Sequence, residues 1–199
     1  KAIIINPNLL EAHFNLGSIF QDLNKIDAAI ESYKQVLIIK PNFIEVLNNL
    51  GVILQNHRHT ENAIKYFEEA LLIDPDFAEA HNNIGNSFRE LGQLDNAFNS
   101  YEKAVSIKPE FLDANFNLAV IYQEYKEFDN AIRHYLNVIK VNADYAPAHN
   151  NLGVIYKEIK KISKSIESLE RAIFINPNYA EAHYNLGASL QEFEYFEKA

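Results

Sequence analysis

Histidine has the widest chemical range of the residue types in this chain, because an imidazole ring can bind a metal ion or transfer a proton. Four histidines recur at multiples of one interval, each directly after an alanine: His13, His81, His149 and His183. A metal ion requires its ligands at about 2 Å from one centre. Equivalent side chains on neighbouring helices lie farther apart than the roughly 8–10 Å between helix axes. We therefore expect packing roles for these residues, and a solvated turn around His57 and His59.

Carboxylates are abundant, with 27 Asp and Glu residues against 18 Lys and Arg. Paired carboxylates can act as general acid and base, but here they recur along the chain, whereas a catalytic pair should occur once. The absence of Cys excludes a thiolate nucleophile, a thiolate metal site and a disulfide. The glycines stand singly, so the sequence offers no phosphate-binding loop. We predict a chain without catalytic residues, metal or cofactor.

Asparagine gives the clearest pattern. The stretches DFAEAHNNIGNSF (76–88) and NYAEAHYNLGASL (178–190) both place an Asn two residues before a Gly. Such an Asn recurs throughout the chain, in what we call the amide row: Asn15, Asn49, Asn83, Asn117, Asn151 and Asn185. A carboxamide both donates and accepts hydrogen bonds, so a row of them can hold the backbone of an extended peptide. The alternative is that these side chains bridge or cap neighbouring helices.

The residues around the amide row suggest the character of a ligand. Residues three and four apart share a helix face, which places Asn86 beside Asn83 and sets acidic residues at both edges of the face. The position before each Asn varies and holds either a ring or an amide: Phe14, Asn48, Asn82, Phe116, Asn150 and Tyr184. The rings of Phe14, Phe116 and Tyr184 either line pockets for side chains of a partner or are ordinary partly buried residues. We predict an extended protein or peptide ligand, neutral to basic in charge.

The overall charge excludes other partners. The formal net charge is -9 and the sequence pI is about 5.2, whereas nucleic-acid binding requires basic patches that neutralise phosphates and anionic membranes attract polybasic segments. No apolar run approaches the roughly 20 residues that a membrane-spanning helix needs. We expect no nucleic-acid or membrane partner, and a cytoplasmic location.

The elements that position these residues recur with a period of about 34 residues, and self-similarity at a fixed period is typical of repeat architectures. Pro7, Pro41, Pro75 and Pro109 follow one another at that interval, and Pro177 lies two intervals later. Three more series keep the same interval; one of them is Gly17, Gly51, Gly85, Gly153 and Gly187, with Ala119 at the sixth position. The sequence therefore predicts a chain of repeated structural units.

Each repeat reads as two helices. After Pro75, the residues Ala80, Ile84 and Phe88 recur at four-residue steps, as on one face of a helix. Gly92 suits the end of that helix, a second periodic segment follows, and Pro109 ends it. Gly85 lets the two helices of the pair approach closely. A single pair cannot bury its apolar face, so stacking of successive pairs is required.

The sequence resembles the tetratricopeptide repeat family, through Leu50-Gly51, Ala63, Phe67, Ala70 and Pro75 and their equivalents in other repeats. The resemblance implies an all-α solenoid, a right-handed superhelix of antiparallel helix pairs whose first helices line a concave groove. It covers one array over 1–199, divided as a tail of a preceding repeat (1–9), five full repeats (10–43, 44–77, 78–111, 112–145 and 146–179) and a partial repeat (180–199). The AHNNLG-like phrases are similar to repeats of O-linked N-acetylglucosamine transferases.

Three functional hypotheses follow. The first is a non-catalytic scaffold that binds a peptide in the groove. The second is the substrate-recognition arm of a larger enzyme, such as a glycosyltransferase of the O-linked N-acetylglucosamine type, with its catalytic domain outside this chain. The third is end-to-end self-association through uncapped termini, because the chain has no Met and both its ends fall within predicted repeats.

Overall fold

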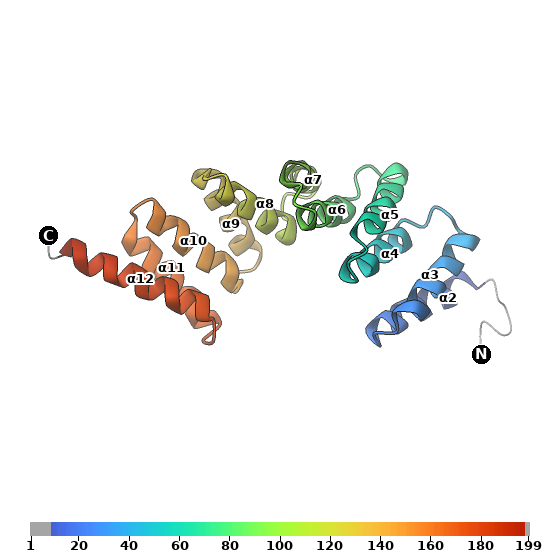
Figure 1. Cartoon of the computed structure of the whole chain (residues 1–199), viewed down its shortest axis with the longest axis horizontal. Helices are drawn as coiled ribbons and strands as arrows, with labels where there is room; N and C mark the ends of the chain where they lie inside the picture. Colours follow the sequence, from blue (N-terminus) through green and yellow to red (C-terminus); the bar gives the residue numbers. More distant parts are fainter. Residues whose placement is uncertain (1–8, 198–199) are drawn as a thin grey trace. The chain divides into compact units, whose positions relative to one another are not determined.

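The structure is a computed structural model that describes residues 9–197, with side chains described to residue 194. Every regular element in that range is an α-helix (Figure 1). Residues 1–8 of the predicted tail (1–9) lie outside the described residues, as do 198 and 199. The chain divides into two compact units, Lys1–Ile107 and Lys108–Ala199.

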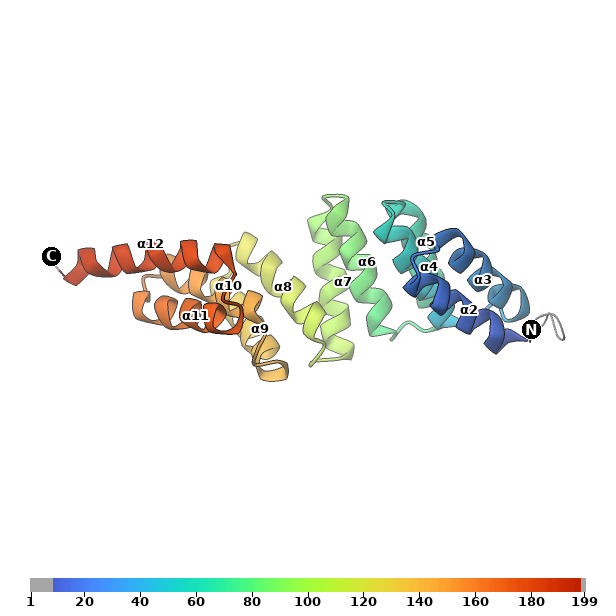
Figure 2. The same cartoon turned by 90° about the horizontal axis from the view of Figure 1, so that it is seen from below.

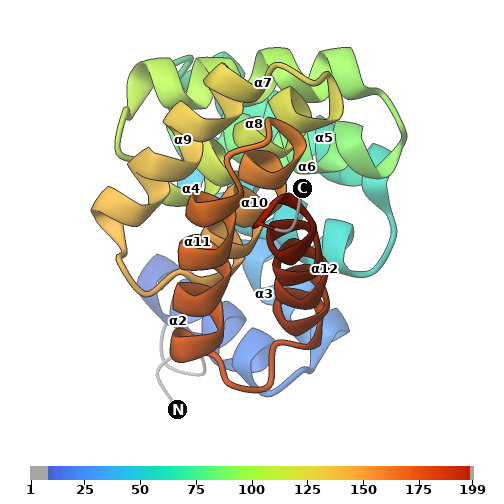
Figure 3. The same cartoon turned by 90° about the vertical axis from the view of Figure 1, so that its left-hand side faces the viewer.

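Each unit is built from pairs of helices joined by short turns (Figure 2). Unit 1 contains α2 (Leu10–Asp22), α3 (Ile26–Ile39), α4 (Ile44–Asn56), α5 (Thr60–Ile73), α6 (Ala78–Glu90) and α7 (Leu94–Ile107). Unit 2 contains α8 (Leu112–Glu124), α9 (Phe128–Val141), α10 (Ala146–Glu158), α11 (Ile162–Ile175) and α12 (Ala180–Glu197). In unit 2, α12 packs against α11 and α10 (Figure 3). The prediction of an all-α fold of repeated helix pairs is confirmed.

The turn within each pair has one geometry. Its central residue takes a positive φ, at Asn24, Arg58, Gly92, Lys126 and Lys160. In the third pair, the N–H of Gly92 donates to the carbonyl of Arg89 at 3.0 Å, and the N–H of Gln93 donates to the carbonyl of Phe88 at 2.8 Å. These two bonds define a Schellman motif, which satisfies carbonyls at a helix end. The same pair of bonds closes the other four turns.

The core of each pair is a large ring or leucine from the second helix, which in four of the five pairs lies over a glycine of the first helix; the fourth pair has Ala119 at that position. Tyr33, Phe67, Tyr101, Tyr135 and Leu169 are the largest such residues, and each is at most 1% exposed. A Cβ added at Gly85 would lie 2.7 Å from Cε1 of Tyr101, and one at Gly153 would lie 2.5 Å from Cγ of Leu169. Gly17 and Gly51 meet Tyr33 and Phe67 in the same way. The glycines thus make room for the side chain that the second helix inserts.

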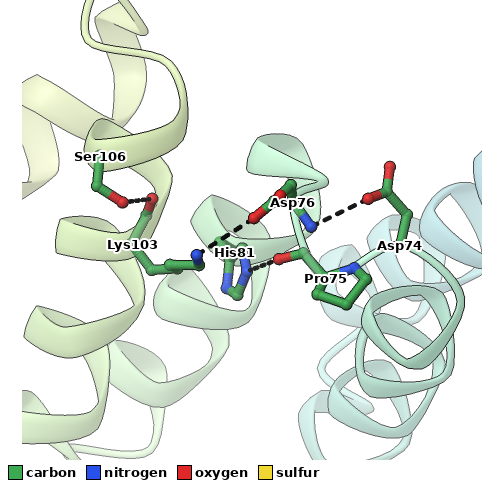
Figure 4. Close-up of polar contacts among 6 residues, drawn as sticks. All are labelled: Asp74, Pro75, Asp76, His81, Lys103 and Ser106. Atoms are coloured by element: carbon green, nitrogen blue, oxygen red, sulfur yellow. Dashed lines mark hydrogen bonds and ion pairs between the residues drawn. The ribbon is translucent and has the colours of Figure 1, made fainter.

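The connector between one pair and the next is held by a side chain of the following helix. Nε2 of His81 donates to the carbonyl of Pro75 at 2.9 Å, beside an Asp74 carboxylate that accepts from the N–H of Asp76 at 3.0 Å (Figure 4). Lys103 pairs with Asp76 at 3.2 Å across the same loop (Figure 4). His149 and His183 make the same bond to Ala143 and Pro177.

Three of the four recurring histidines, His81, His149 and His183, therefore close connectors, a role more specific than the predicted packing. Asn115 occupies the equivalent position in unit 2 and donates to the carbonyl of Pro109 at 2.9 Å. Because the acceptor is a backbone carbonyl, Ala143 serves as well as proline. Within residues 9–194, no group of three or more His, Asp or Glu side chains is placed to hold a metal ion.

Candidate functional site

The amide row lies on the first helix of each pair. In unit 1 it consists of Asn15 on α2, Asn49 on α4 and Asn83 on α6. In unit 2 it consists of Asn117 on α8, Asn151 on α10 and Asn185 on α12. Asn15 is exposed, whereas the other five are half-buried. The sequence pattern predicts side chains open to a groove; the structure shows them partly enclosed between helices.

Two members of the row are bound to a buried tyrosine. Nδ2 of Asn151 donates to the hydroxyl of Tyr135 at 2.9 Å, and that hydroxyl donates to Oε1 of Gln123 at 2.9 Å. In unit 1, Asn49 and Ser18 are both placed to donate to the hydroxyl of Tyr33, which itself donates to Oε1 of Gln21 at 3.3 Å. The bonds from Asn151 and Asn49 join a first helix to the second helix of the preceding pair.

Two other members are bound to an asparagine on the preceding first helix. Nδ2 of Asn83 donates to Oδ1 of Asn48 at 3.0 Å, and Nδ2 of Asn185 donates to Oδ1 of Asn150 at 3.0 Å. Asn150 in turn donates to Oε1 of Glu181 at 3.1 Å, so an acidic residue at the edge of the face joins the network. The bridging role that the sequence left as an alternative therefore occurs in four of the six positions.

The three rings of the predicted site divide into two kinds. Phe14 and Phe116 are half-buried. Phe14 stacks on Phe43 with ring centroids 5.5 Å apart, and Phe116 meets Tyr145 edge-on at 5.2 Å. Tyr184 on α12 has 77% of its surface exposed. Of the three rings, Tyr184 has the greatest surface available to a partner.

Unit 1 holds a polar cavity of about 420 Å³ on the same face, at the C-terminal ends of α4 and α6. Its lining consists of Gln55, Asn56, Asn86, Arg89 and Glu90. Oδ1 of Asn86 accepts from the hydroxyl of Tyr101 at 2.8 Å, and Oε2 of Glu90 accepts from Oγ1 of Thr60 at 3.0 Å. Burial raises the pKa of Tyr101 to about 12, so this phenol stays a donor.

The cavity combines groups that suit a peptide backbone. The amides of Gln55, Asn56 and Asn86 both donate and accept, Arg89 only donates, and an ionised Glu90 only accepts. The sequence predicted Asn86 as a binding residue, gave Arg89 only the role of partly offsetting the acidic charge of the face, and missed Gln55. The available signal was the separation of Gln55 and Arg89 by one repeat period, which places them at one position of successive repeats.

Comparison with protein families identifies the architecture. The family model described as "TPR repeat" matches residues 17–57, 85–125, 124–160 and 155–192, and the model described as "Tetratricopeptide repeat" matches residues 44–77. Together these ranges include most of the chain. The chain belongs to the tetratricopeptide repeat family. Its similarity to the repeats of O-linked N-acetylglucosamine transferases in particular stays a prediction.

Solved structures with the tetratricopeptide repeat fold are similar over most of the chain. YrrB, described as "a TPR protein with an unusual peptide-binding site", is 21% identical over 92% of this chain and 94% of its own, with a TM-score of 0.71. MamA is 22% identical over 86% of this chain and 94% of its own, with a TM-score of 0.71. PilF of Pseudomonas aeruginosa is 19% identical over 92% of this chain and 83% of its own, with a TM-score of 0.83. Identities this low establish the fold alone, and curated protein sequences give no match.

Proposed function

We propose that this tetratricopeptide repeat protein is a non-catalytic scaffold that binds an extended, neutral to basic peptide segment along the faces of its first helices. The observation that carries the proposal is the cavity lined by Gln55, Asn56, Asn86, Arg89 and Glu90. It lies where the amide row passes through unit 1, and its groups match the donors and acceptors of a peptide backbone.

The neighbouring structures support an interaction role for the fold. YrrB carries a peptide-binding site by its own description, and a repeat solenoid offers extended surface without catalytic chemistry. Net charge -9 and the acidic edges of the row favour a neutral or basic ligand. No described helix is long and apolar enough to span a membrane. The alternative role, as the recognition arm of a glycosyltransferase, finds no support in the relatives found.

The experiment is a peptide array probed with the wild type and two variants of matched charge. Arg89→Ala removes a cation from the cavity, and Lys103→Ala removes one from a connector in the same unit (Figure 4). We expect captured peptides to weaken with Arg89→Ala and to persist with Lys103→Ala. Equal binding by all three proteins, or no binding by the wild type, would overturn the proposal. Changes at Asn83 or Asn151 suit this test less well, because those residues also join helices.

A further inference from the structure

The hydrogen-bond partner of each residue in the amide row depends on the residue types at two earlier positions in the sequence. The first lies 16 residues before the row residue, on the preceding second helix. The second lies 35 residues before it, on the preceding first helix. The four cases contained within one unit are Asn49 with Tyr33 and Phe14, Asn83 with Phe67 and Asn48, Asn151 with Tyr135 and Phe116, and Asn185 with Leu169 and Asn150.

These positions change together. Where the first position is a tyrosine, the side-chain amide of the row residue donates to its hydroxyl. The second position is then a phenylalanine packed against that tyrosine, with ring centroids 6.0 Å apart for Phe14 and 5.7 Å apart for Phe116. Phe67 and Leu169 have no hydroxyl. Where they occupy the first position, the row residue donates instead to Oδ1 of the asparagine at the second position, Asn48 or Asn150. In each described case one of the two positions holds the anchor and the other is apolar; Asn83 and Asn151 also accept, from Asn82 at 3.4 Å and Asn150 at 3.2 Å.

We propose that the amide row is oriented by two interchangeable anchors, a tyrosine hydroxyl from the preceding second helix or an asparagine carbonyl from the preceding first helix. Tyr33, Tyr135, Asn48 and Asn150 are positioning residues in this scheme. A half-buried carboxamide without a partner carries a desolvation cost, so each of the four described cases keeps an anchor. The fifth row residue with both positions, Asn117, has Tyr101 and Asn82 there, so the sequence offers both kinds of anchor at that one place.

The anchor also fixes how the carboxamide of a row residue can bind further groups. The bond to Asn150 uses one N–H of Asn185 and leaves its second N–H and carbonyl oxygen for other partners, whereas Oδ1 of Asn151 also accepts from Asn150 at 3.2 Å. A fixed carboxamide loses less rotamer freedom when it binds a ligand than a mobile one does. The anchoring itself rests on the described hydrogen bonds and does not depend on the proposed peptide binding.

The second repeat of unit 1 offers the sharpest test, because it retains the setting for a tyrosine. Gln55, 8% exposed, occupies there the position of Gln21 and Gln123, which accept from the tyrosines of their own repeats. Phe67→Tyr should therefore place a hydroxyl between Gln55 and Asn83. That single change supplies a tyrosine anchor while the asparagine anchor, Asn48, is still present.

The experiment compares the wild type, Asn48→Ala, Phe67→Tyr and the double variant, by thermal unfolding and by the side-chain amide signals of Asn83 in NMR. In the wild-type background, Asn48→Ala removes the anchor, and we expect a Tm lower by about 2–4 °C with shifted Asn83 signals. In the Phe67→Tyr background the same change should lower the Tm by less than half as much. Equal losses in both backgrounds, or a Phe67→Tyr variant that unfolds, would overturn the proposal.

A mirror variant in unit 2 provides a control within one spectrum. Tyr135→Phe removes the anchor of Asn151 and leaves the bond between Asn185 and Asn150 in place. We expect the amide signals of Asn151 to move most. Those of Asn185, which is linked to Asn151 only through the bond from Asn150 to Oδ1 of Asn151 at 3.2 Å, should move by less than half as much. Equal movement of both, or movement of neither, contradicts separate anchors. None of these measurements uses a peptide. A peptide array without binding would therefore not contradict the anchoring of the amide row, and a negative result for the Asn48→Ala and Phe67→Tyr variants would not contradict peptide binding.

Discussion

At the scale of single residues, Gly85 shows how the core is built, since the ring of Tyr101 lies where its side chain would be. Gly85→Leu should lower the free energy of unfolding by about 1–3 kcal/mol or more through overpacking. Gly187 provides the matched control, because no described atom lies within 4 Å of a Cβ added there. Gly187→Ala should raise helix stability by up to about 1 kcal/mol. Urea denaturation of both variants measures the difference, and equal effects would refute this view of the core.

His134 should make the stability of unit 2 depend on pH. The side chain is 6% exposed, Nδ1 lies 2.9 Å from Oδ1 of Asn115, and the ring stacks on Tyr122 at 5.5 Å. Burial, helped by the adjacent Arg133, lowers the pKa from 6.5 to about 4. Between these values the unfolded chain binds a proton that the folded chain does not, so stability falls as pH is lowered from about 6.5 to about 4.

The expected loss is on the order of 1–3 kcal/mol, measured as the difference between the wild type and His134→Gln across that range. Subtracting the variant removes the contribution of the other histidines. Above pH 6.5 the contribution from His134 is complete and constant. Parallel curves for the two proteins between pH 7 and pH 4 would show that His134 is not the titrating group.

At the scale of elements, the turns within the pairs store backbone strain at charged residues. Lys126 takes a φ of 60°, a region that costs an L-residue roughly 1–2 kcal/mol. Glycine carries no such penalty but has a more flexible unfolded state. We expect Lys126→Gly to stabilise unit 2 by about 0.5–1 kcal/mol, and Gly92→Ala, at a φ of 72°, to destabilise unit 1 by about 1 kcal/mol. Changes of the same sign in the two denaturation curves would exclude this explanation.

The helices and their period could be predicted from the sequence, because prolines, glycines and apolar positions visibly recur at one fixed interval. The turn geometry was visible only at Gly92. Asn24, Arg58, Lys126 and Lys160 take the same conformation without a glycine signal. There the geometry is imposed by the packing of the two helices, which overrides local preference.

The candidate site was predicted less completely. The amide row and Asn86 follow from helical spacing, but which atom each carboxamide binds depends on residues 16 and 35 positions away on other helices. The connector histidines illustrate the same limit, since their acceptor is a backbone carbonyl, which no residue type marks. Recurring residue types can be seen in a sequence, but the atoms that their side chains contact cannot.

At the scale of the whole molecule, α12 presents apolar surface that could join two copies. Tyr184, Leu190 and Phe193 are 77%, 43% and 36% exposed. We predict that the molar mass from light scattering rises with protein concentration, and that Tyr184→Glu combined with Phe193→Glu reduces the rise. Leu72→Glu, at an 84% exposed position on α5, is the control and should leave it unchanged. A mass that is constant across concentrations rejects self-association.

The central claim is that the faces of the first helices bind a peptide. The most direct measurement follows the asparagine side-chain amide signals in NMR while a peptide captured on the array is added. If the claim is correct, the signals of Asn83, Asn86, Asn151 and Asn185 move in proportion to saturation, whereas those of Asn99 on α7 and Asn130 on α9 stay in place. Movement confined to Asn99 and Asn130 would place the binding surface on the second helices and contradict the account.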